Sequence, residues 1–240
     1  MEVLISPVSV AEALAAAEGG ADIVDVKDVA EGSLGASFPW VIRGVAAALR
    51  GRGVRISATL GDLPYAPGTA ALAALGAAAS GARYIKAGLH GVRGDGQALG
   101  VMRAVVRACR EHDPRTVVVA AGYADYRRFG GIDPQTVVRA GGAAGADLVM
   151  LDTAIKDGPA LFDALSPGEL ADFVGAARAR GLRVALAGSI RAEHLDALRR
   201  LGPDVVGVRG AVCRGGARSA PLDAALVRAF VAAARAPRPA

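Results

Sequence analysis

The sequence predicts a single α/β domain, a (β/α)₈ barrel of the TIM type spanning residues 1–235. Short apolar runs alternate with Ala-rich amphipathic stretches, and Gly or Pro stands at the joins, which is typical of repeated strand–helix units. A phrase of one glycine, two turn residues and an apolar run, which reads Gly-Ala-Asp in two of its four copies, recurs at similar intervals along the chain. The length of 240 residues suits one such barrel.

The composition supports a buried core built from aliphatic side chains. Hydrophobic residues make up 52% of the chain, charged residues 21% and aromatic residues only 4%. Val, Leu, Ile and Ala must therefore form the interior, as they do in parallel strands that helices cover on the outside.

Eight strands are expected, separated by helices. Ser9 and Glu12 have the spacing of a reciprocal capping box at the start of the first helix, and the Gly19-Gly20 pair should end it. A last helix follows Ala220, and residues 236–240 are expected to be a disordered tail. The expected strand starts are Glu2, Ile23, Arg55, Tyr84, Thr116, Leu148, Val184 and Val205.

The recurring phrase indicates an internal repeat. Its copies begin at Gly20, Gly81, Gly145 and Gly202, at separations of 61, 64 and 57 residues. Each copy reads as a glycine that ends a helix, a short turn and a strand, which gives strands two, four, six and eight. The alternative is that the phrase is merely a common helix-to-strand turn, which explains any one copy but not the even spacing.

Equivalent positions in the repeat should point to the same side of the barrel, because side chains alternate faces along a strand. Alternate strands supply the four side chains of each interior layer. The two expected layers, the second nearer the C-terminal ends of the strands, are Asp25, Lys86, Met150 and Gly207, then Lys27, Gly88, Asp152 and Arg209.

Lysine is rare and is placed selectively. Of 28 basic residues only Lys27, Lys86 and Lys156 are lysines, and all three lie at or just after an expected strand end. Arginine stays protonated, whereas a desolvated lysine can lose its proton and form a Schiff base with a carbonyl. The sequence therefore predicts amine chemistry at the mouth of the barrel. The alternative is that Lys27 and Lys86 are only buried partners of acidic residues.

Asp25 and Asp152 are the candidate carboxylates at the same end of the barrel. Either could orient a lysine or transfer protons. A purely structural ion-pair role is the alternative for each.

A phosphate site is expected at the loops after strands seven and eight. Gly188 and Ser189 follow the seventh strand, and Arg209 and Gly210 end the eighth. Glycine lets the backbone approach an anion, and Arg209 could add a bidentate contact. Ordinary turn glycines are the alternative.

The long segment 31–40 after strand two could be a lid over the mouth. The three histidines show no metal-ligand spacing, so no metal site is predicted. No glycine-rich nucleotide motif is present, so no cofactor is predicted.

The predicted partner is a small phosphorylated carbonyl substrate. The net charge of +5 permits nucleic-acid binding, but the arginines are scattered and aromatics are few, so none is predicted. No apolar run is long enough to span a membrane. Two cysteines without a CxxC motif suit a cytoplasmic protein, and we expect a homo-oligomer.

Several long motifs resemble the (5-formylfuran-3-yl)methyl phosphate synthase family of methanofuran biosynthesis, over nearly the whole chain. The matching motifs are Leu4-Ile-Ser-Pro7, Glu18-Gly-Gly-Ala-Asp-Ile-Val-Asp-Val-Lys27, Glu31-Gly-Ser-Leu-Gly-Ala-Ser-Phe-Pro-Trp40, Ala120-Ala-Gly-Tyr-Ala-Asp125, Met150-Leu-Asp-Thr-Ala-Ile-Lys-Asp-Gly158 and Ala185-Leu-Ala-Gly-Ser-Ile190.

The resemblance implies a (β/α)₈ enzyme that condenses two molecules of glyceraldehyde 3-phosphate into a furan carboxaldehyde phosphate, with loss of phosphate and water. It implies that Lys27 forms the Schiff base. It also implies that Asp25, Lys86, Asp152 and Lys156 assist proton transfers and phosphate loss.

Two rival functions remain open on the residues alone. A different Schiff-base aldolase or a triose isomerase could use the same fold and Lys27, but would release no phosphate. A non-catalytic barrel that binds a phosphorylated ligand would show binding without turnover.

Overall fold

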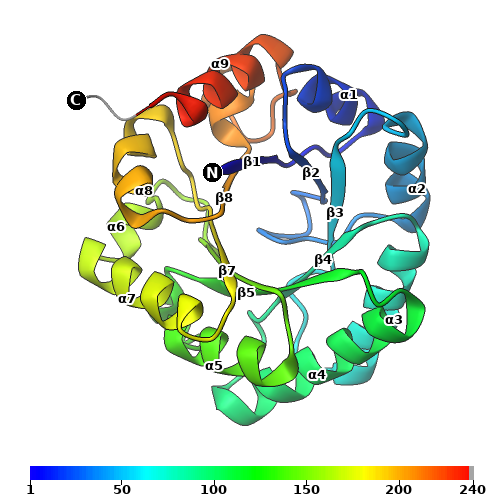
Figure 1. Ribbon diagram of the computed structural model, residues 1–240, viewed down its shortest axis with the longest axis vertical. Helices are drawn as coiled ribbons and strands as arrows, with labels where there is room; N and C mark the ends of the chain where they lie inside the picture. Colours follow the sequence, from blue (N-terminus) through cyan, green and yellow to red (C-terminus); the bar gives the residue numbers. More distant parts are fainter. Residues whose placement is uncertain (238–240) are drawn as a thin grey trace.

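Residues 1–237 of the computed structural model form a closed barrel of eight parallel strands surrounded by helices (Figure 1). Each strand pairs with the next along the chain, and β8 pairs with β1 to close the ring. The predicted (β/α)₈ barrel is confirmed.

The strands begin at or within one residue of their predicted starts. They are β1 (Glu2–Ile5), β2 (Ile23–Val26), β3 (Arg55–Thr59), β4 (Tyr84–Gly88), β5 (Val117–Tyr123), β6 (Leu148–Asp152), β7 (Arg183–Leu186) and β8 (Val205–Val208). The helices are α1 (Val10–Glu18), α2 (Pro39–Ala48), α3 (Pro67–Ala79), α4 (Gly94–His112), α5 (Pro134–Ala144), α6 (Leu161–Ala164), α7 (Pro167–Arg178), α8 (Leu195–Leu201) and α9 (Ala224–Arg235). Each strand is followed by a helix, and β6 is followed by two.

The start of α1 confirms half of the predicted capping box. The Ser9 hydroxyl accepts a hydrogen bond from the Glu12 amide at 3.2 Å. The reciprocal half is wrong, because the Glu12 carboxylate accepts from the Val8 amide at 2.9 Å and binds Arg209 instead. Gly20, with φ of 91°, takes the left-handed conformation that ends the helix.

The barrel interior contains the first predicted layer. Lys86 and Asp25 form an ion pair inside it, with 2.6 Å between Nζ and Oδ2. A Cβ placed on Gly207 would lie 3.5 Å from Cε of Met150, so these two positions also face each other. Alternation along parallel strands therefore brings the acidic and basic residues of the repeat together.

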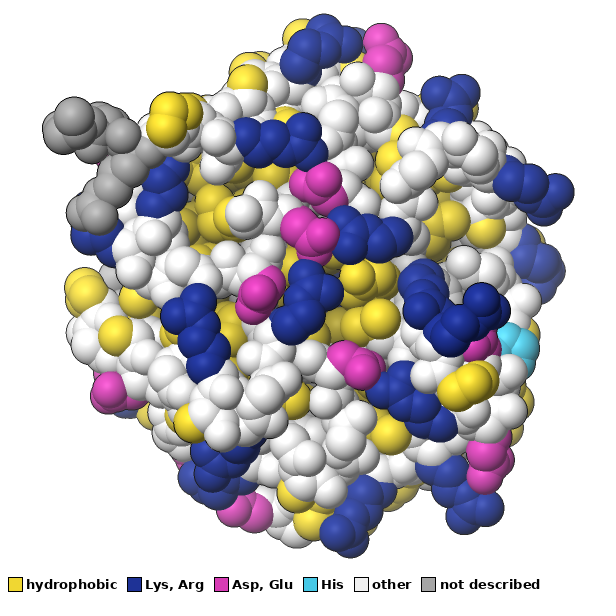
Figure 2. Space-filling model, in the orientation of Figure 1, with side chains coloured by type: hydrophobic (Ala, Val, Ile, Leu, Met, Phe, Trp, Pro, Cys, Tyr) yellow, Lys and Arg dark blue, Asp and Glu magenta, His cyan; other side chains and the backbone are white. Residues whose placement is uncertain are grey.

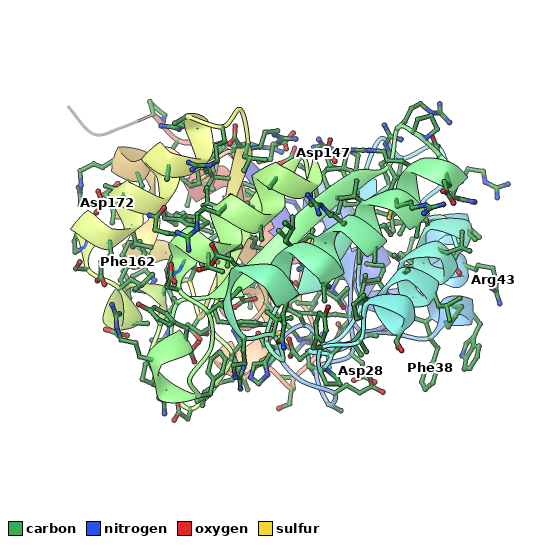
Figure 3. All side chains as sticks on the ribbon, turned by 90° about the horizontal axis from the view of Figure 1, so that it is seen from below. Asp28, Phe38, Arg43, Asp147, Phe162 and Asp172 are labelled. Carbon is green, nitrogen blue, oxygen red and sulfur yellow. The ribbon has the colours of Figure 1, made fainter. Side chains whose placement is uncertain are left out.

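The two ends of the barrel differ in what they carry. Figure 3 shows Asp28 and Phe38, which follow β2, at one edge and Asp147, which precedes β6, at the opposite edge. Near the starts of the strands, Glu2 pairs with Arg55 and Arg183, each at 2.7 Å. The lysines lie toward the other end.

Basic and acidic side chains are intermingled across the face seen in Figure 2.

None of the helices in residues 1–237 combines the length and the apolar character needed to cross a bilayer. Ala236 and Pro237 are exposed beyond α9. The rest of the predicted disordered tail, 238–240, lies outside the described residues.

Candidate active site

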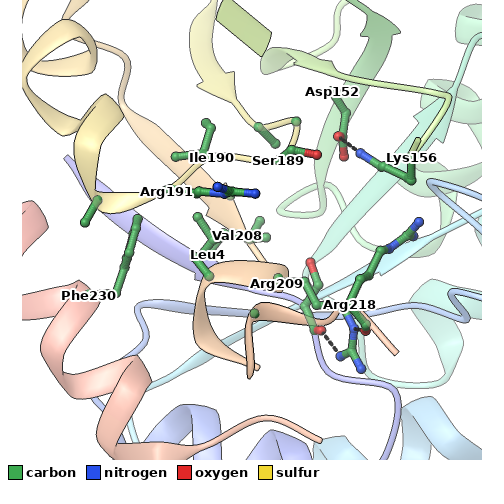
Figure 4. Close-up of a pocket in the computed structure, with 18 of the residues that line it drawn as sticks. Leu4, Asp152, Lys156, Ser189, Ile190, Arg191, Val208, Arg209, Arg218 and Phe230 are labelled. Atoms are coloured by element: carbon green, nitrogen blue, oxygen red, sulfur yellow. Dashed lines mark hydrogen bonds and ion pairs between the residues drawn. The ribbon is translucent and has the colours of Figure 1, made fainter. Parts of the chain in front are cut away.

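A cavity of about 780 Å³ opens at the C-terminal ends of the strands (Figure 4). Its walls include Lys27, Lys86, Asp152 and Lys156, together with the loops that follow β7 and β8. The volume is within the range of sites for drug-sized ligands and exceeds what one three-carbon phosphate needs. The lysines predicted from the sequence therefore share one pocket.

Lys27 is the most strongly perturbed amine of the pocket. The residue immediately follows β2 and is only 5% exposed, and its Nζ donates to the Ser33 carbonyl at 3.1 Å. Burial lowers the pKa of its ammonium to about 7, with Lys86 and Lys156 acting in the same direction and Asp152 and Asp25 opposing. Lys27 therefore loses its proton far more readily than an ordinary lysine. A neutral amine facing a pocket can attack a carbonyl.

Asp25 lies beneath the pocket and is fully buried. Its carboxylate accepts from Lys86 Nζ at 2.6 Å, from the Ser57 hydroxyl at 2.7 Å and from the Ser6 hydroxyl at 3.2 Å. Burial alone would raise the pKa of Asp25, but the charges of Lys86 and Lys27 and these hydrogen bonds outweigh it, and the pKa is lowered. Asp25 is therefore a fixed anion that compensates the buried lysines.

Asp152 and Lys156 form the second ion pair of the pocket, drawn as a dashed line in Figure 4. Lys156 Nζ donates to Asp152 Oδ1 at 2.6 Å and to the Thr153 hydroxyl at 2.9 Å. Burial opposes ionisation of Asp152, but the charges of Lys156 and Lys27 prevail and hold its pKa below the usual range. Asp152 is therefore an anion at neutral pH, and Lys156 is held at the pocket wall.

The segment after β2 folds over the barrel mouth and is tied to several strands. The Ser33 hydroxyl donates to the Thr153 carbonyl at 2.7 Å, and the Leu34 amide donates to Asp62 at 3.2 Å. Leu34 is fully buried and packs with the side chains of the barrel interior. The Ser33 carbonyl that receives Lys27 Nζ is thus held in place. Whether the rest of 31–40 acts as a lid stays a prediction.

The loop after β7 presents free backbone donors to the pocket. Gly188 has φ of 107° and Ser189 has φ of 50°, a conformation that is rare for residues other than glycine. A Cβ on Gly188 would lie 3.0 Å from Cγ2 of Thr153, so only glycine fits there. Within residues 1–237, the amide N–H groups of Ser189 and Ile190 donate to no protein acceptor. Such unused N–H groups suit an anion.

The loop after β8 adds similar donors, while its arginine is occupied. The amides of Gly210 and Ala211 also donate to no acceptor in residues 1–237. All N–H groups of Arg209 are engaged: Nη1 binds Glu12 at 2.8 Å and the Ser6 carbonyl at 2.7 Å, and Nε binds the Arg218 carbonyl at 2.7 Å. Longer contacts use Nη2. The predicted Arg209–phosphate contact stays a prediction, and the geometry favours the neighbouring amides.

Sequence reasoning missed two arginines that line the cavity, Arg191 and Arg218. Figure 4 shows Arg191 beside Ser189 and Ile190, and Arg218 on the side of the pocket where Lys156 lies. Nothing in their spacing distinguishes them from the other arginines. Ser57 was also missed, although it is the register partner of Asp25 on β3, and strand pairing could have revealed it.

Solved structures of similar shape share the fold. The chain superposes on 3-hexulose-6-phosphate synthase with a TM-score of 0.64 and 20% identity, covering 96% of this chain and 99% of that one. Its superposition on phosphoribosyl anthranilate isomerase from Thermus thermophilus has a TM-score of 0.60 and 20% sequence identity, and it covers 97% of this chain and 98% of that one. At these identities the likeness concerns the barrel alone.

Comparison of sequences is more specific. A profile of the 4-HFC-P synthase family matches residues 3–231. A (5-formylfuran-3-yl)methyl phosphate synthase from Archaeoglobus fulgidus is 56% identical over 215 residues, covering 90% of this chain and 92% of the relative. The synthase from Methanosarcina mazei is 50% identical over 232 residues, covering 97% of this chain and 98% of the relative. The chain therefore belongs to the (5-formylfuran-3-yl)methyl phosphate (4-HFC-P) synthase family.

Proposed function

We propose that the protein condenses two molecules of glyceraldehyde 3-phosphate into (5-formylfuran-3-yl)methyl phosphate, for the biosynthesis of methanofuran or a related one-carbon cofactor. Relatives that are 50–56% identical carry the name of this synthase. The atoms balance when one phosphate and two water molecules are lost, with no net oxidation. Because a carbon–oxygen bond to phosphate breaks without hydrolysis, the enzyme would be a carbon–oxygen lyase.

The observation that carries this proposal is the buried Lys27 amine, whose pKa is lowered to about 7 and which faces a pocket with acids and bases around it. Its neutral form would add to the aldehyde of one triose and release water as the Schiff base forms. Removal of a proton from the adjacent carbon would give an enamine, whose carbon bonds to C3 of the second triose as the phosphate leaves that carbon. The C2 hydroxyl of the second triose would then add to the Schiff-base carbon, and loss of the Lys27 amine and of a second water would complete the furan ring, with the aldehyde of the second triose retained.

The other charged residues would serve these steps in pairs. Asp152 and Lys156 lie at the pocket wall, where they could transfer protons to and from the substrate. Asp25 and Lys86 would form an ion pair beneath Lys27, where Lys86 lowers the pKa of the Lys27 amine and Asp25 raises it. Neither pair requires a cofactor, and we propose that the reaction proceeds in the cytoplasm without one.

The phosphate of the first triose would bind at the loops after β7 and β8. The free amides of Ser189, Ile190, Gly210 and Ala211 supply the donors, and Arg191 supplies a charge. Barrels of this fold commonly hold phosphate at these two loops.

Incubation of the purified protein with glyceraldehyde 3-phosphate alone tests the proposal. We expect inorganic phosphate and a furan aldehyde phosphate, identified by mass, to form in equal amounts, and neither to form with Lys27→Arg. Triose isomerisation or binding without phosphate release would exclude the synthase reaction in favour of an isomerase, a different aldolase or a binding barrel.

A further inference from the structure

The condensation proposed above brings two phosphate groups into one pocket, and the donors of the loops after β7 and β8 are assigned above to the first of them. The cavity of about 780 Å³ continues past these loops to the side where Lys156 and Arg218 lie (Figure 4). A second anion would need cationic donors that the protein does not already use.

Three of the six cationic side chains that line the pocket are paired with a carboxylate of the protein. Lys86 pairs with Asp25 at 2.6 Å and Lys156 with Asp152 at 2.6 Å. Arg209 pairs with Glu12 at 2.8 Å. Buried charges are normally compensated in this way, because an unpaired charge is costly away from water.

Arg218 is not paired in this way, and the two other cations without a carboxylate partner in residues 1–237, Lys27 and Arg191, are assigned above to the Schiff base and to the first phosphate. Its guanidinium donates one hydrogen bond, from Nη2 to the Gly32 carbonyl at 2.9 Å, and no carboxylate of residues 1–237 lies within ion-pair distance. An arginine has five N–H donors, so four remain. Burial lowers the pKa of Arg218, and the positive charge of Arg209 acts in the same direction. This cation therefore lacks a partner that the protein supplies.

The neighbouring groups leave room for an anion here. Asp152 and Asp62 act on Arg218 from a distance and raise its pKa, but both already accept hydrogen bonds within the protein. Asp152 accepts from Lys156, and Asp62 accepts from the Leu34 amide and the Tyr123 hydroxyl. Lys156 uses two of its three N–H donors and keeps one. A guanidinium and an ammonium with free donors are a strong combination for a phosphate.

We propose that Arg218, with the remaining donor of Lys156, binds the phosphate of the second triose. This inference rests on the proposed condensation, because only a reaction of two phosphorylated molecules needs two such sites. Arg218 would hold the second substrate at Lys27, on the opposite side from the amides of Ser189 and Ile190. It would be a specificity-determining residue that selects a phosphorylated aldehyde as the second reactant.

Calorimetric titration of the whole chain with glycerol 3-phosphate tests the second site. This probe carries the phosphate but no carbonyl, so it cannot react with Lys27. We expect two molecules to bind each chain. In Arg218→Gln one molecule of glycerol 3-phosphate should bind with unchanged affinity. The second should bind about 10- to 100-fold more weakly, because the loss of hydrogen bonds from a charged group weakens binding by about that factor. Arg214→Gln, a change in the same loop at an exposed side chain outside the cavity, should leave both unchanged.

Trapping with borohydride separates the two substrates. With glyceraldehyde 3-phosphate, Arg218→Gln should still form the adduct at Lys27, while phosphate release should need a substrate concentration about 10- to 100-fold higher. Because Arg218 also binds Gly32, Arg218→Lys serves as the second variant. It keeps the charge and a donor for Gly32, and should bind two molecules of glycerol 3-phosphate.

Unchanged binding of two molecules by Arg218→Gln would overturn the proposal. So would a single binding site in the wild type, or loss of both sites in Arg218→Lys, which would make Arg218 a purely structural residue. If the wild type makes no furan but binds two molecules, one of them through Arg218, then the condensation fails and the second anion site stands.

Discussion

Removal of the Lys86 amine should destabilise the protein by leaving Asp25 as a buried, uncompensated anion. Lys86 and Asp25 are 1% and 0% exposed, and 2.6 Å separates Nζ from Oδ2. Breaking such a pair typically costs about 3–5 kcal/mol, while the whole free energy of unfolding of a domain is about 5–15 kcal/mol. Lys86→Met should therefore lose a large fraction of the stability of the barrel at pH 7.

The double variant Asp25→Asn/Lys86→Met isolates the charge effect. An amide at position 25 can still accept from the Ser57 hydroxyl, which lies 2.7 Å away, and it carries no charge. We expect this variant to recover about 2 kcal/mol or more of the loss in urea unfolding. Arg107→Met removes an exposed arginine paired with Glu111 and should leave the midpoint unchanged.

The pH dependence gives a second check on the same pair. In Lys86→Met, burial should raise the pKa of Asp25 above its unfolded value, so the destabilisation should shrink as the pH falls toward 4. A Lys86→Met protein that unfolds at the wild-type urea concentration, or a double variant as unstable as the single one, would refute this account of the pair.

Three further changes test other parts of the structure. Between pH 7 and 10.5 the unfolded chain binds a proton at Lys27 that the folded protein does not, so the free energy of unfolding of the wild type, relative to that of Lys27→Met, should rise with pH. Urea unfolding of both proteins at pH 7 and 9 measures this difference, and a constant difference would contradict the lowered pKa. Gly88→Ala places Cβ 2.7 Å from the Tyr123 hydroxyl, and this clash should lower the free energy of unfolding by about 1–3 kcal/mol and with it the Tm. The control Gly96→Ala places its Cβ more than 4 Å from any other side chain and should not lower the Tm. Ser33→Ala removes a buried 2.7 Å hydrogen bond to the loop after β6 and should lower Tm by a few degrees, from a loss of about 1–3 kcal/mol; an unchanged Tm would show that this bond does not hold the segment.

The fold was predictable because its signals are local and repeated. A glycine that ends a helix and an apolar run that starts a strand stand next to each other in the chain, so the start of β6 at Leu148 needs no distant information. Strand alternation then predicted that Asp25 and Lys86 share a layer, and they form an ion pair. The lysine positions followed from chemistry, since arginine cannot replace a neutral amine.

Other parts of the site depend on tertiary contacts that local patterns do not contain. Glu12 has capping-box spacing, but its carboxylate turns to Arg209, which lies 197 residues away in sequence. A long loop can point an arginine in several directions, so the sequence does not distinguish Arg218 from its neighbours, and its place in the pocket depends on how the β8–α9 loop folds. The hydrogen bond from Lys27 to the Ser33 carbonyl depends in the same way on how the segment after β2 folds.

Chemical trapping shows whether Lys27 is the amine that forms the Schiff base. The protein would be treated with glyceraldehyde 3-phosphate and borohydride at several pH values, and the modified lysine located by peptide mass spectrometry. We expect a reduced triose adduct on Lys27, with a yield that rises with pH and is half-maximal near pH 7, because burial lowers the pKa of this amine to about 7. An adduct on Lys86 or Lys156 instead, or none at any pH, would contradict it.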